Sequence, residues 1–146
     1  MLPLLLFSPS RARAQQAATV YKDPTCGCCS NWVALLRKDG FMVSVTDAKD
    51  ISAVKDKYRI PQTLRSCHTA LIDGYVIEGH VPPADIQQLL KDRAAVAGLG
   101  VPGMPIGSPG MEVSGVAPQA YDVMAFTKDG KSRIFASYRQ GTRTPA

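Results

Sequence analysis

Residues 18–36 read ATVYKDPTCGCCSNWVALL and join a short strand to a helix that begins among three cysteines. The strand is predicted over Ala18–Lys22, and the turn-forming pair Asp23-Pro24 ends it. Thr25 is expected to cap the helix that follows. The apolar residues of that helix recur at helical spacing, and they are Trp32, Val33, Leu35 and Leu36. We therefore expect Trp32 to lie in the core.

The elements expected downstream complete one α/β domain. They are a strand over Phe41–Thr46, a helix over Ser52–Tyr58, a hairpin of Thr69–Ile72 and Tyr75–Glu78 about Asp73-Gly74, and a helix opened by Pro82-Pro83. A β-α-β unit followed by a β-β-α unit is the thioredoxin-like order, and it makes the first two strands a parallel pair. The sequence therefore predicts an α/β, thioredoxin-like fold.

The C-terminal third is expected to depart from this pattern. Ten of the 21 residues from Gly98 to Pro118 are glycine or proline, which predicts a long loop without regular structure. Tyr121–Thr127 and Ser132–Tyr138 flank a turn and predict an extra C-terminal β-hairpin. We expect residues 17–139 to form one thioredoxin-like metal-binding domain. Residues 140–146 are expected to be a disordered tail, with Arg143 in solvent.

Residues 1–16 have the pattern of a signal-peptide remnant or a disordered leader. Leu2–Phe7 is apolar, and Ala12 and Ala14 form the Ala-x-Ala pattern of a cleavage site. No basic segment precedes the apolar run, so the signal is interpreted as truncated. A frayed cytosolic N-terminus is the alternative. The apolar run is shorter than the roughly 20 residues that span a bilayer. We expect an exported, periplasmic protein whose mature form does not enter a membrane.

The composition is that of an ordinary globular protein. The chain has 146 residues, of which 45% are hydrophobic and 20% charged, and this excludes a wholly disordered chain. The formal net charge of +5 comes from scattered rather than clustered basic residues. Nucleic acid is therefore not an expected partner.

Three of the four cysteines lie in the motif Cys26-Gly27-Cys28-Cys29, at the start of the first predicted helix. Unpaired backbone N–H groups and the helix dipole favour negative charge at that position, so they stabilise thiolates. A thiolate is both a nucleophile and a metal ligand. The motif is therefore a candidate for metal binding or for thiol chemistry.

The fourth cysteine belongs to the motif Ser66-Cys67-His68-Thr69, just before the third predicted strand. In a thioredoxin-like arrangement this segment lies beside the start of the first helix. Cys67 and His68 would then face the other three cysteines. Four sulfurs and one imidazole form a soft ligand set that suits Cu(I), with Zn(II) as the less favoured metal.

Two other interpretations of the cysteines stay open. Cys26 and Cys29 form a C-x-x-C pair, which is typical of thiol–disulfide oxidoreductases. Such enzymes carry a proline just before the third strand, where this chain has Ser66-Cys67-His68. Alternatively, the four cysteines form two structural disulfides, although three of them crowd into four residues.

Three further residues are weaker candidate ligands. His80 follows the predicted hairpin, and a lone histidine is more often structural than a ligand. Met104 and Met111 lie in the Gly/Pro-rich loop, and thioethers bind Cu(I) well. Met42 and Met124 fall in predicted strands, so we expect them in the core.

Four motifs in this order resemble the DUF411 family. They are the two cysteine motifs, Glu78-Gly79-His80-Val81-Pro82, and the run from Val101 to Glu112. The resemblance extends from Val20 to Tyr138.

The resemblance to the DUF411 family implies a thioredoxin-like domain in the periplasm that serves copper resistance and homeostasis. It implies a multinuclear Cu(I) cluster bridged by cysteine sulfurs, interconversion of Cu(I) and Cu(II), and other periplasmic copper-handling proteins as partners. By motif match the ligands are Cys26, Cys28, Cys29, Cys67 and His68. This favours a metal-binding protein over an enzyme, with copper oxidoreductase activity as the enzymatic alternative.

Overall fold

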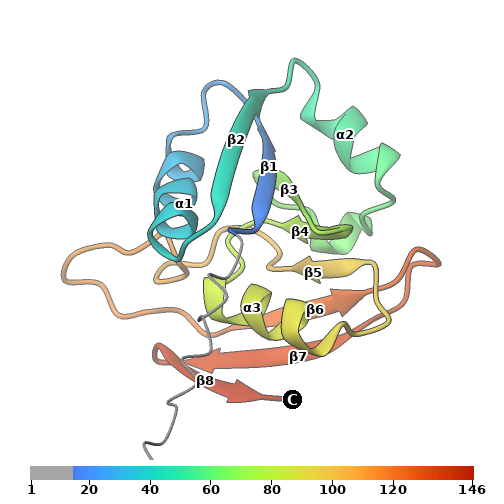
Figure 1. Cartoon of the computed structure of the whole chain (residues 1–146). Coiled ribbons are helices and arrows are strands. Elements are labelled where there is room, and N and C mark those ends of the chain that lie inside the picture. Colours follow the sequence, from blue (N-terminus) through green and yellow to red (C-terminus); the bar gives the residue numbers. More distant parts are fainter. Residues whose placement is uncertain (1–14) are drawn as a thin grey trace, which may run out of the picture.

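The computed structural model describes residues 15–146, which form a mixed α/β structure (Figure 1). One sheet has eight strands in the order β2-β1-β3-β4-β5-β6-β7-β8. The strands are β1 Ala17–Lys22, β2 Met42–Asp47, β3 His68–Ile72, β4 Tyr75–Glu78, β5 Gly98–Gly100, β6 Tyr121–Phe126, β7 Ser132–Arg139 and β8 Thr142–Pro145. The helices are α1 Gly27–Lys38, α2 Ile51–Lys57 and α3 Pro83–Asp92, with a 3-10 helix, η1, at Gln62–Leu64. The apolar run and the Ala-x-Ala pattern of the predicted leader lie outside the described residues.

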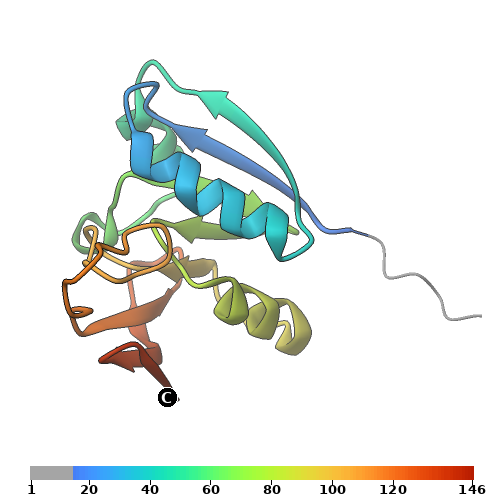
Figure 2. The same cartoon turned by 90° about the vertical axis from the view of Figure 1, so that its left-hand side faces the viewer.

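The predicted order of elements is confirmed from β1 to α3. β1 pairs with β2 in parallel, as expected, and with β3 in antiparallel orientation. β3 and β4 form the predicted hairpin about Asp73-Gly74. Figure 2 shows the whole sheet, with β2 at one end and the C-terminal strands at the other.

The first helix begins differently from the prediction. Its N-cap is Cys26, and no side chain caps its backbone there. The hydroxyl of Thr25 instead donates to Asp23 in the preceding turn, so the predicted Thr25 cap is wrong. The first turn of α1 therefore leaves its backbone N–H groups beside the cysteines rather than bonded to a capping side chain.

The main core lies where α1 and α3 pack on one face of the sheet. Its fully buried side chains include Trp32, Leu36, Ile77, Ile86 and Leu89, which confirms Trp32 as a core residue. A smaller cluster lies on the other face and consists of Ile60, Leu64, Val76 and Phe126, with Met124 packed against it. Met42 is 56% exposed because it lies in the edge strand β2, so its predicted core position is wrong.

The Gly/Pro-rich segment is less irregular than predicted. Its first three residues form β5, which pairs with β4 and β6. A Cβ at Gly98 would collide with the backbone carbonyl of Val76, so glycine allows this close pairing. Residues 101–118 contain no helix or strand, as expected.

The expected disordered tail is also wrong, because residues 142–145 form β8 and pair with β7. A side chain of β8 also contacts Asp85 of α3, whose carboxylate is fully buried. It accepts hydrogen bonds from the Tyr138 hydroxyl at 2.6 Å and from Nε of Arg143 at 2.7 Å. Arg143 is therefore a partner of a buried charge and not a solvated side chain.

No helix within residues 15–146 has the length and apolar character needed to cross a membrane.

Replacing Arg143 with alanine should lower the free energy of unfolding by about 1–3 kcal/mol, because buried Asp85 loses its only cationic partner among the described residues. Arg139→Ala is the matched control, since Arg139 pairs with Asp122 at the surface and should cost less than about 1 kcal/mol. Urea unfolding of both variants measures the difference. If the two substitutions lower the free energy of unfolding equally, the Arg143–Asp85 ion pair does not anchor β8 to α3.

Candidate metal centre

The two cysteine motifs meet because of the pairing of β1 with β3. Lys22, the last residue of β1, lies opposite His68, the first residue of β3. The chain leaving β1 toward Cys26 and the chain entering β3 from Cys67 therefore lie at the same end of the sheet. The structure brings together residues that are about forty positions apart in the sequence.

Four cysteine sulfurs form a compact cluster at this end of the sheet. The Sγ atoms of Cys26, Cys28, Cys29 and Cys67 all lie within 4.8 Å of one another. Cys29 is fully buried at the start of α1, and the other three are partly exposed. The cluster thus has a buried base and an accessible side.

The cluster is partly oxidised in this structure. Cys26 and Cys29 form a disulfide, with their Cα atoms 5.7 Å apart. Cys28 and Cys67 are free thiols. The Sγ of Cys28 lies 3.4 Å from the Sγ of Cys26. Two sulfurs are therefore available as thiols, and two more become available when the disulfide is reduced.

The pKa of the Cys67 thiol is raised to about 11, mainly by burial and also by the neighbouring Cys28, while a hydrogen bond from Ser66 lowers it in part. Cys67 lies just before β3 and not on α1, and burial keeps the proton on its thiol at neutral pH. A metal at this position would therefore have to displace the Cys67 proton.

His68 is fully buried next to Cys67. Its Nδ1 lies 3.2 Å from the Sγ of Cys67, and its ring centroid lies 4.3 Å from that of Trp32. Its Nε2 has no hydrogen-bond partner among the described residues. Burial, followed by the nearby His80 and Lys55, holds the pKa of His68 well below its ordinary value. The imidazole is therefore neutral at physiological pH and keeps a lone pair for a metal.

His80 lies closer to the cluster than its place in the sequence suggests. Its ring is 5.1 Å from that of His68, and Cys67, His68 and His80 have ligand atoms within 4.8 Å of one another. The Nδ1 of His80 lies 2.6 Å from the carbonyl oxygen of Pro109, while its Nε2 has no partner within residues 15–146. Burial also lowers the pKa of His80. A second neutral imidazole therefore adjoins the cysteine cluster.

The structure separates the two loop methionines. The thioether of Met104 lies 3.6 Å from the Sγ of Cys28. Met111 instead closes a turn of the loop through its backbone, which bonds to Gly107 and Ser108. Met104 therefore has its thioether at the cluster, whereas the hydrogen bonds of Met111 come from its backbone.

The chain has close relatives among solved structures. Two of them bear the name copper resistance protein CopG, in form 2 and form 1, and each is 44% identical to this chain. Form 2 has a TM-score of 0.81 and aligns over 86% of this chain and 99% of its own. Form 1 has a TM-score of 0.80, with 85% and 98% aligned. Residues 64–111 match the DUF411 family, which is described as a protein of unknown function. The chain belongs to the DUF411 family. No curated protein matches it.

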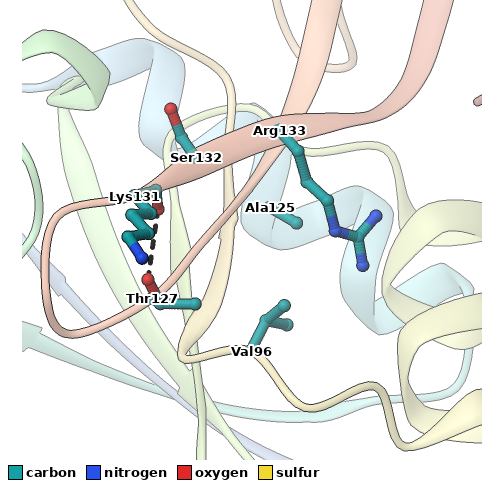
Figure 3. A pocket seen from close by; sticks show the side chains of 6 residues that line it. All are labelled: Val96, Ala125, Thr127, Lys131, Ser132 and Arg133. Carbon is teal, nitrogen blue, oxygen red and sulfur yellow. Dashed lines mark hydrogen bonds between the residues drawn. The ribbon is translucent and has the colours of Figure 1, made fainter.

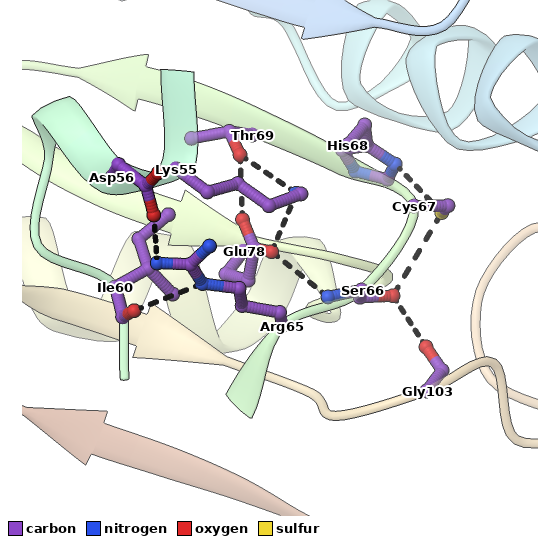
Figure 4. A network of polar contacts seen from close by, with 10 residues as sticks. All are labelled: Lys55, Asp56, Ile60, Arg65, Ser66, Cys67, His68, Thr69, Glu78 and Gly103. Atoms are coloured by element: carbon purple, nitrogen blue, oxygen red, sulfur yellow. Dashed lines mark hydrogen bonds and ion pairs between the residues drawn. The ribbon is translucent and has the colours of Figure 1, made fainter. Parts of the chain in front are cut away.

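Sequence motifs alone missed a polar network beneath the site of this DUF411 protein (Figure 4). Lys55 and Glu78 form an ion pair at 2.6 Å, with side chains that are 5% and 0% exposed. The one sequence signal was an acidic residue ending a strand that is otherwise apolar, Tyr75–Glu78. Such a residue is unusual in a core unless it is paired.

A pocket near the β6–β7 turn lies away from the metal centre of this DUF411 protein (Figure 3). Its lining residues are Val96, Ala125, Thr127, Lys131, Ser132 and Arg133. Neither cysteine motif contributes to it, so it is not part of the candidate metal centre.

Thiol counting tests the oxidation pattern directly. Denatured, untreated protein should react with two equivalents of a thiol reagent, through Cys28 and Cys67, and reduced protein with four. Peptide mass mapping should place the disulfide between Cys26 and Cys29. Detection of Cys28 or Cys67 in the native disulfide would contradict this pattern.

Proposed function

We propose that this protein is an exported copper-binding protein that holds several Cu(I) ions at the cysteine cluster and serves copper resistance. The observation that carries the proposal is the convergence of four sulfurs, from two separate motifs, within 4.8 Å. The names of the two solved relatives support copper as the metal. Soft thiolates select Cu(I), which strengthens the same choice.

The proposed ligands are Cys26, Cys28, Cys29 and Cys67, with His68 completing the site through a ring nitrogen. A thiolate sulfur retains lone pairs after it binds one copper ion, so it can bridge to a second. Four sulfurs this close together therefore suit a bridged, multinuclear Cu(I) site better than separate mononuclear ones.

Two additional donors adjoin the cluster, and one of them, Met104, favours copper over zinc. Met104 places a thioether beside Cys28, and thioethers bind Cu(I) but are poor ligands for Zn(II). His80 adds a neutral imidazole beside His68. We assign Met104 and His80 to the edge of the site, and we do not assign Met111.

We further propose that the Cys26–Cys29 pair couples copper to a two-electron change. The two thiolates give one electron each to two Cu(II) ions, the S–S bond forms, and two Cu(I) ions result. In the reverse step the S–S bond accepts two electrons from two Cu(I) ions and breaks into two thiolates. The Cys26–Cys29 disulfide supports this role because it places a pair of sulfurs that can exchange two electrons within the cluster.

The second candidate function is a thiol–disulfide oxidoreductase of the thioredoxin-like type. The disulfide at the start of α1, after the first strand of a β-α-β unit, favours it. Against it, Ser66-Cys67 occupies the position just before β3, and this adds a thiol where such enzymes have a proline.

We propose that the copper-binding protein acts in the periplasm, where other copper-handling proteins would donate or receive its metal.

Replacing Cys67 with serine should weaken Cu(I) binding by at least about 100-fold, because loss of outer-sphere partners alone costs 10–100-fold. The measurement is competition with a Cu(I) chelator on reduced protein under anaerobic conditions. Ser30→Ala is the control, since Ser30 is exposed beside Cys29. Exchange of the Cys26–Cys29 disulfide with a small dithiol should survive in the Cys67 variant. Normal copper binding combined with lost dithiol exchange would favour the oxidoreductase instead.

Replacing Met104 with leucine should weaken Cu(I) binding by about 10-fold and leave Zn(II) binding unchanged, because a thioether contributes only to the softer ion. Met111→Leu is the matched control from the same loop and should change neither affinity. The same chelator competition, repeated with zinc, measures both. Equal effects of the two substitutions on Cu(I) would remove Met104 from the site.

A further inference from the structure

The carboxylate of Glu78 is the centre of the buried network in Figure 4. Oε2 accepts hydrogen bonds from Nζ of Lys55 at 2.6 Å and from the backbone N–H of Ser66 at 2.8 Å. Oε1 accepts from the hydroxyl of Thr69 at 2.6 Å. Lys55 also donates to the Thr69 hydroxyl at 3.0 Å. Both oxygens of a fully buried carboxylate are therefore satisfied.

Stability alone does not explain this arrangement. Removing two charges from water is costly, and apolar residues of similar size commonly replace a buried ion pair without loss of stability. The partners of Glu78 suggest another role, because Ser66 and Thr69 lie on either side of Cys67 and His68. One carboxylate thus holds both ends of the segment that carries two proposed ligands.

A backbone contact holds the same segment from β4. The N–H of Gly79 donates to the carbonyl oxygen of His68 at 3.1 Å. A Cβ at Gly79 would lie 2.6 Å from the Cβ of Ser66, so glycine is needed for this approach. The Ser66 hydroxyl contacts the carbonyl oxygen of Gly103, which precedes Met104. The tethered segment is therefore connected to the loop that carries the thioether.

We propose that Glu78, paired with Lys55, is a positioning residue that holds the Cys67–His68 donor pair against the cysteines of α1. It acts through the Ser66 amide, which fixes the backbone immediately before Cys67. Only the copper readout of this proposal rests on the proposed function, because the position of Cys67 can be measured without metal.

Two double variants separate the acceptor role of the Glu78 side chain from its charge. Lys55→Met with Glu78→Leu removes both charges and the acceptor for the Ser66 amide and the Thr69 hydroxyl. Lys55→Met with Glu78→Gln also removes both charges but retains a carbonyl oxygen that can accept from Ser66. The two variants differ in that acceptor, so the glutamine version is the matched rescue.

Three measurements are made on each variant: the melting temperature, the rate of alkylation of Cys67 relative to Cys28 in metal-free oxidised protein, and Cu(I) affinity after reduction. The leucine variant should melt below the glutamine variant, because the Ser66 amide and the buried Thr69 hydroxyl lose their acceptor, so alkylation and affinity are compared well below both melting temperatures. In the leucine variant, relative Cys67 alkylation should rise several-fold, and Cu(I) affinity should fall by about 10–100-fold. In the glutamine variant, both the Cys67 alkylation rate and the Cu(I) affinity should return most of the way to the values of the parent protein.

The outcomes separate the two proposals. If the Cys67 alkylation rate and the Cu(I) affinity stay unchanged in both variants, the positioning role is overturned. It is also overturned if both variants show the same change in alkylation rate and in affinity, and these changes scale with the drop in melting temperature. Changed alkylation with unchanged Cu(I) affinity in the leucine variant would support positioning and contradict the copper role of Cys67.

Hydrogen exchange on the unmodified protein tests the tether even if the variants do not fold. The Ser66 amide should exchange as slowly as amides within β3. Exchange at the rate of an exposed loop amide would overturn the proposal.

Discussion

The register of β1 against β3 is the constraint on which the cysteine cluster depends. Lys22 lies opposite His68, so the chain leaves one strand and enters the other at a single end of the sheet. Because successive side chains of a strand point to opposite faces, a slip of one residue would exchange the environments of His68 and Thr69. The imidazole would then lie on the Lys55 side and the hydroxyl against Trp32. The cluster therefore forms only in the observed register of β1 against β3, and a register shifted by one residue would remove His68 from it.

The two faces of β3 carry different polar groups for this reason. On the α1 face, His68 packs against Trp32 and His80, and Trp32 donates its indole N–H to the carbonyl of Val81 at 2.9 Å. On the other face, Thr69 belongs to the network of Lys55 and Glu78. Burying a polar atom is unfavourable unless it forms a hydrogen bond. Within residues 15–146, the buried side-chain nitrogen and oxygen atoms that lack a hydrogen bond are Nε2 of His68 and Nε2 of His80. Both imidazoles adjoin the cysteine cluster, and each leaves one ring nitrogen without a hydrogen bond.

The long loop reaches the cluster because of one glycine. Gly110 has a φ of +88°, and a Cβ there would lie 2.9 Å from the backbone nitrogen of Trp32 and 3.1 Å from Nδ1 of His80. A larger residue would push the loop away from α1. The close approach lets Pro109 bond to His80 and lets Met104 lie beside Cys28. At Gly110, therefore, glycine is required by the way the loop packs on α1 and His80.

Local signals in the sequence determined the order of elements through α3, the β3–β4 hairpin and the two cysteine motifs, because turn residues and apolar periodicity act over a few positions. They did not reveal β8, the separation of Met104 from Met111, or the pairing of Lys55 with Glu78. Each of those features depends on a contact between residues that are distant in the sequence. Arg143 and Asp85 are separated by 58 positions, Met104 and Cys28 by 76, and Lys55 and Glu78 by 23. Tertiary structure decided them, because a buried charge or a thioether acquires its partner only when the sheet and its covering segments have come together.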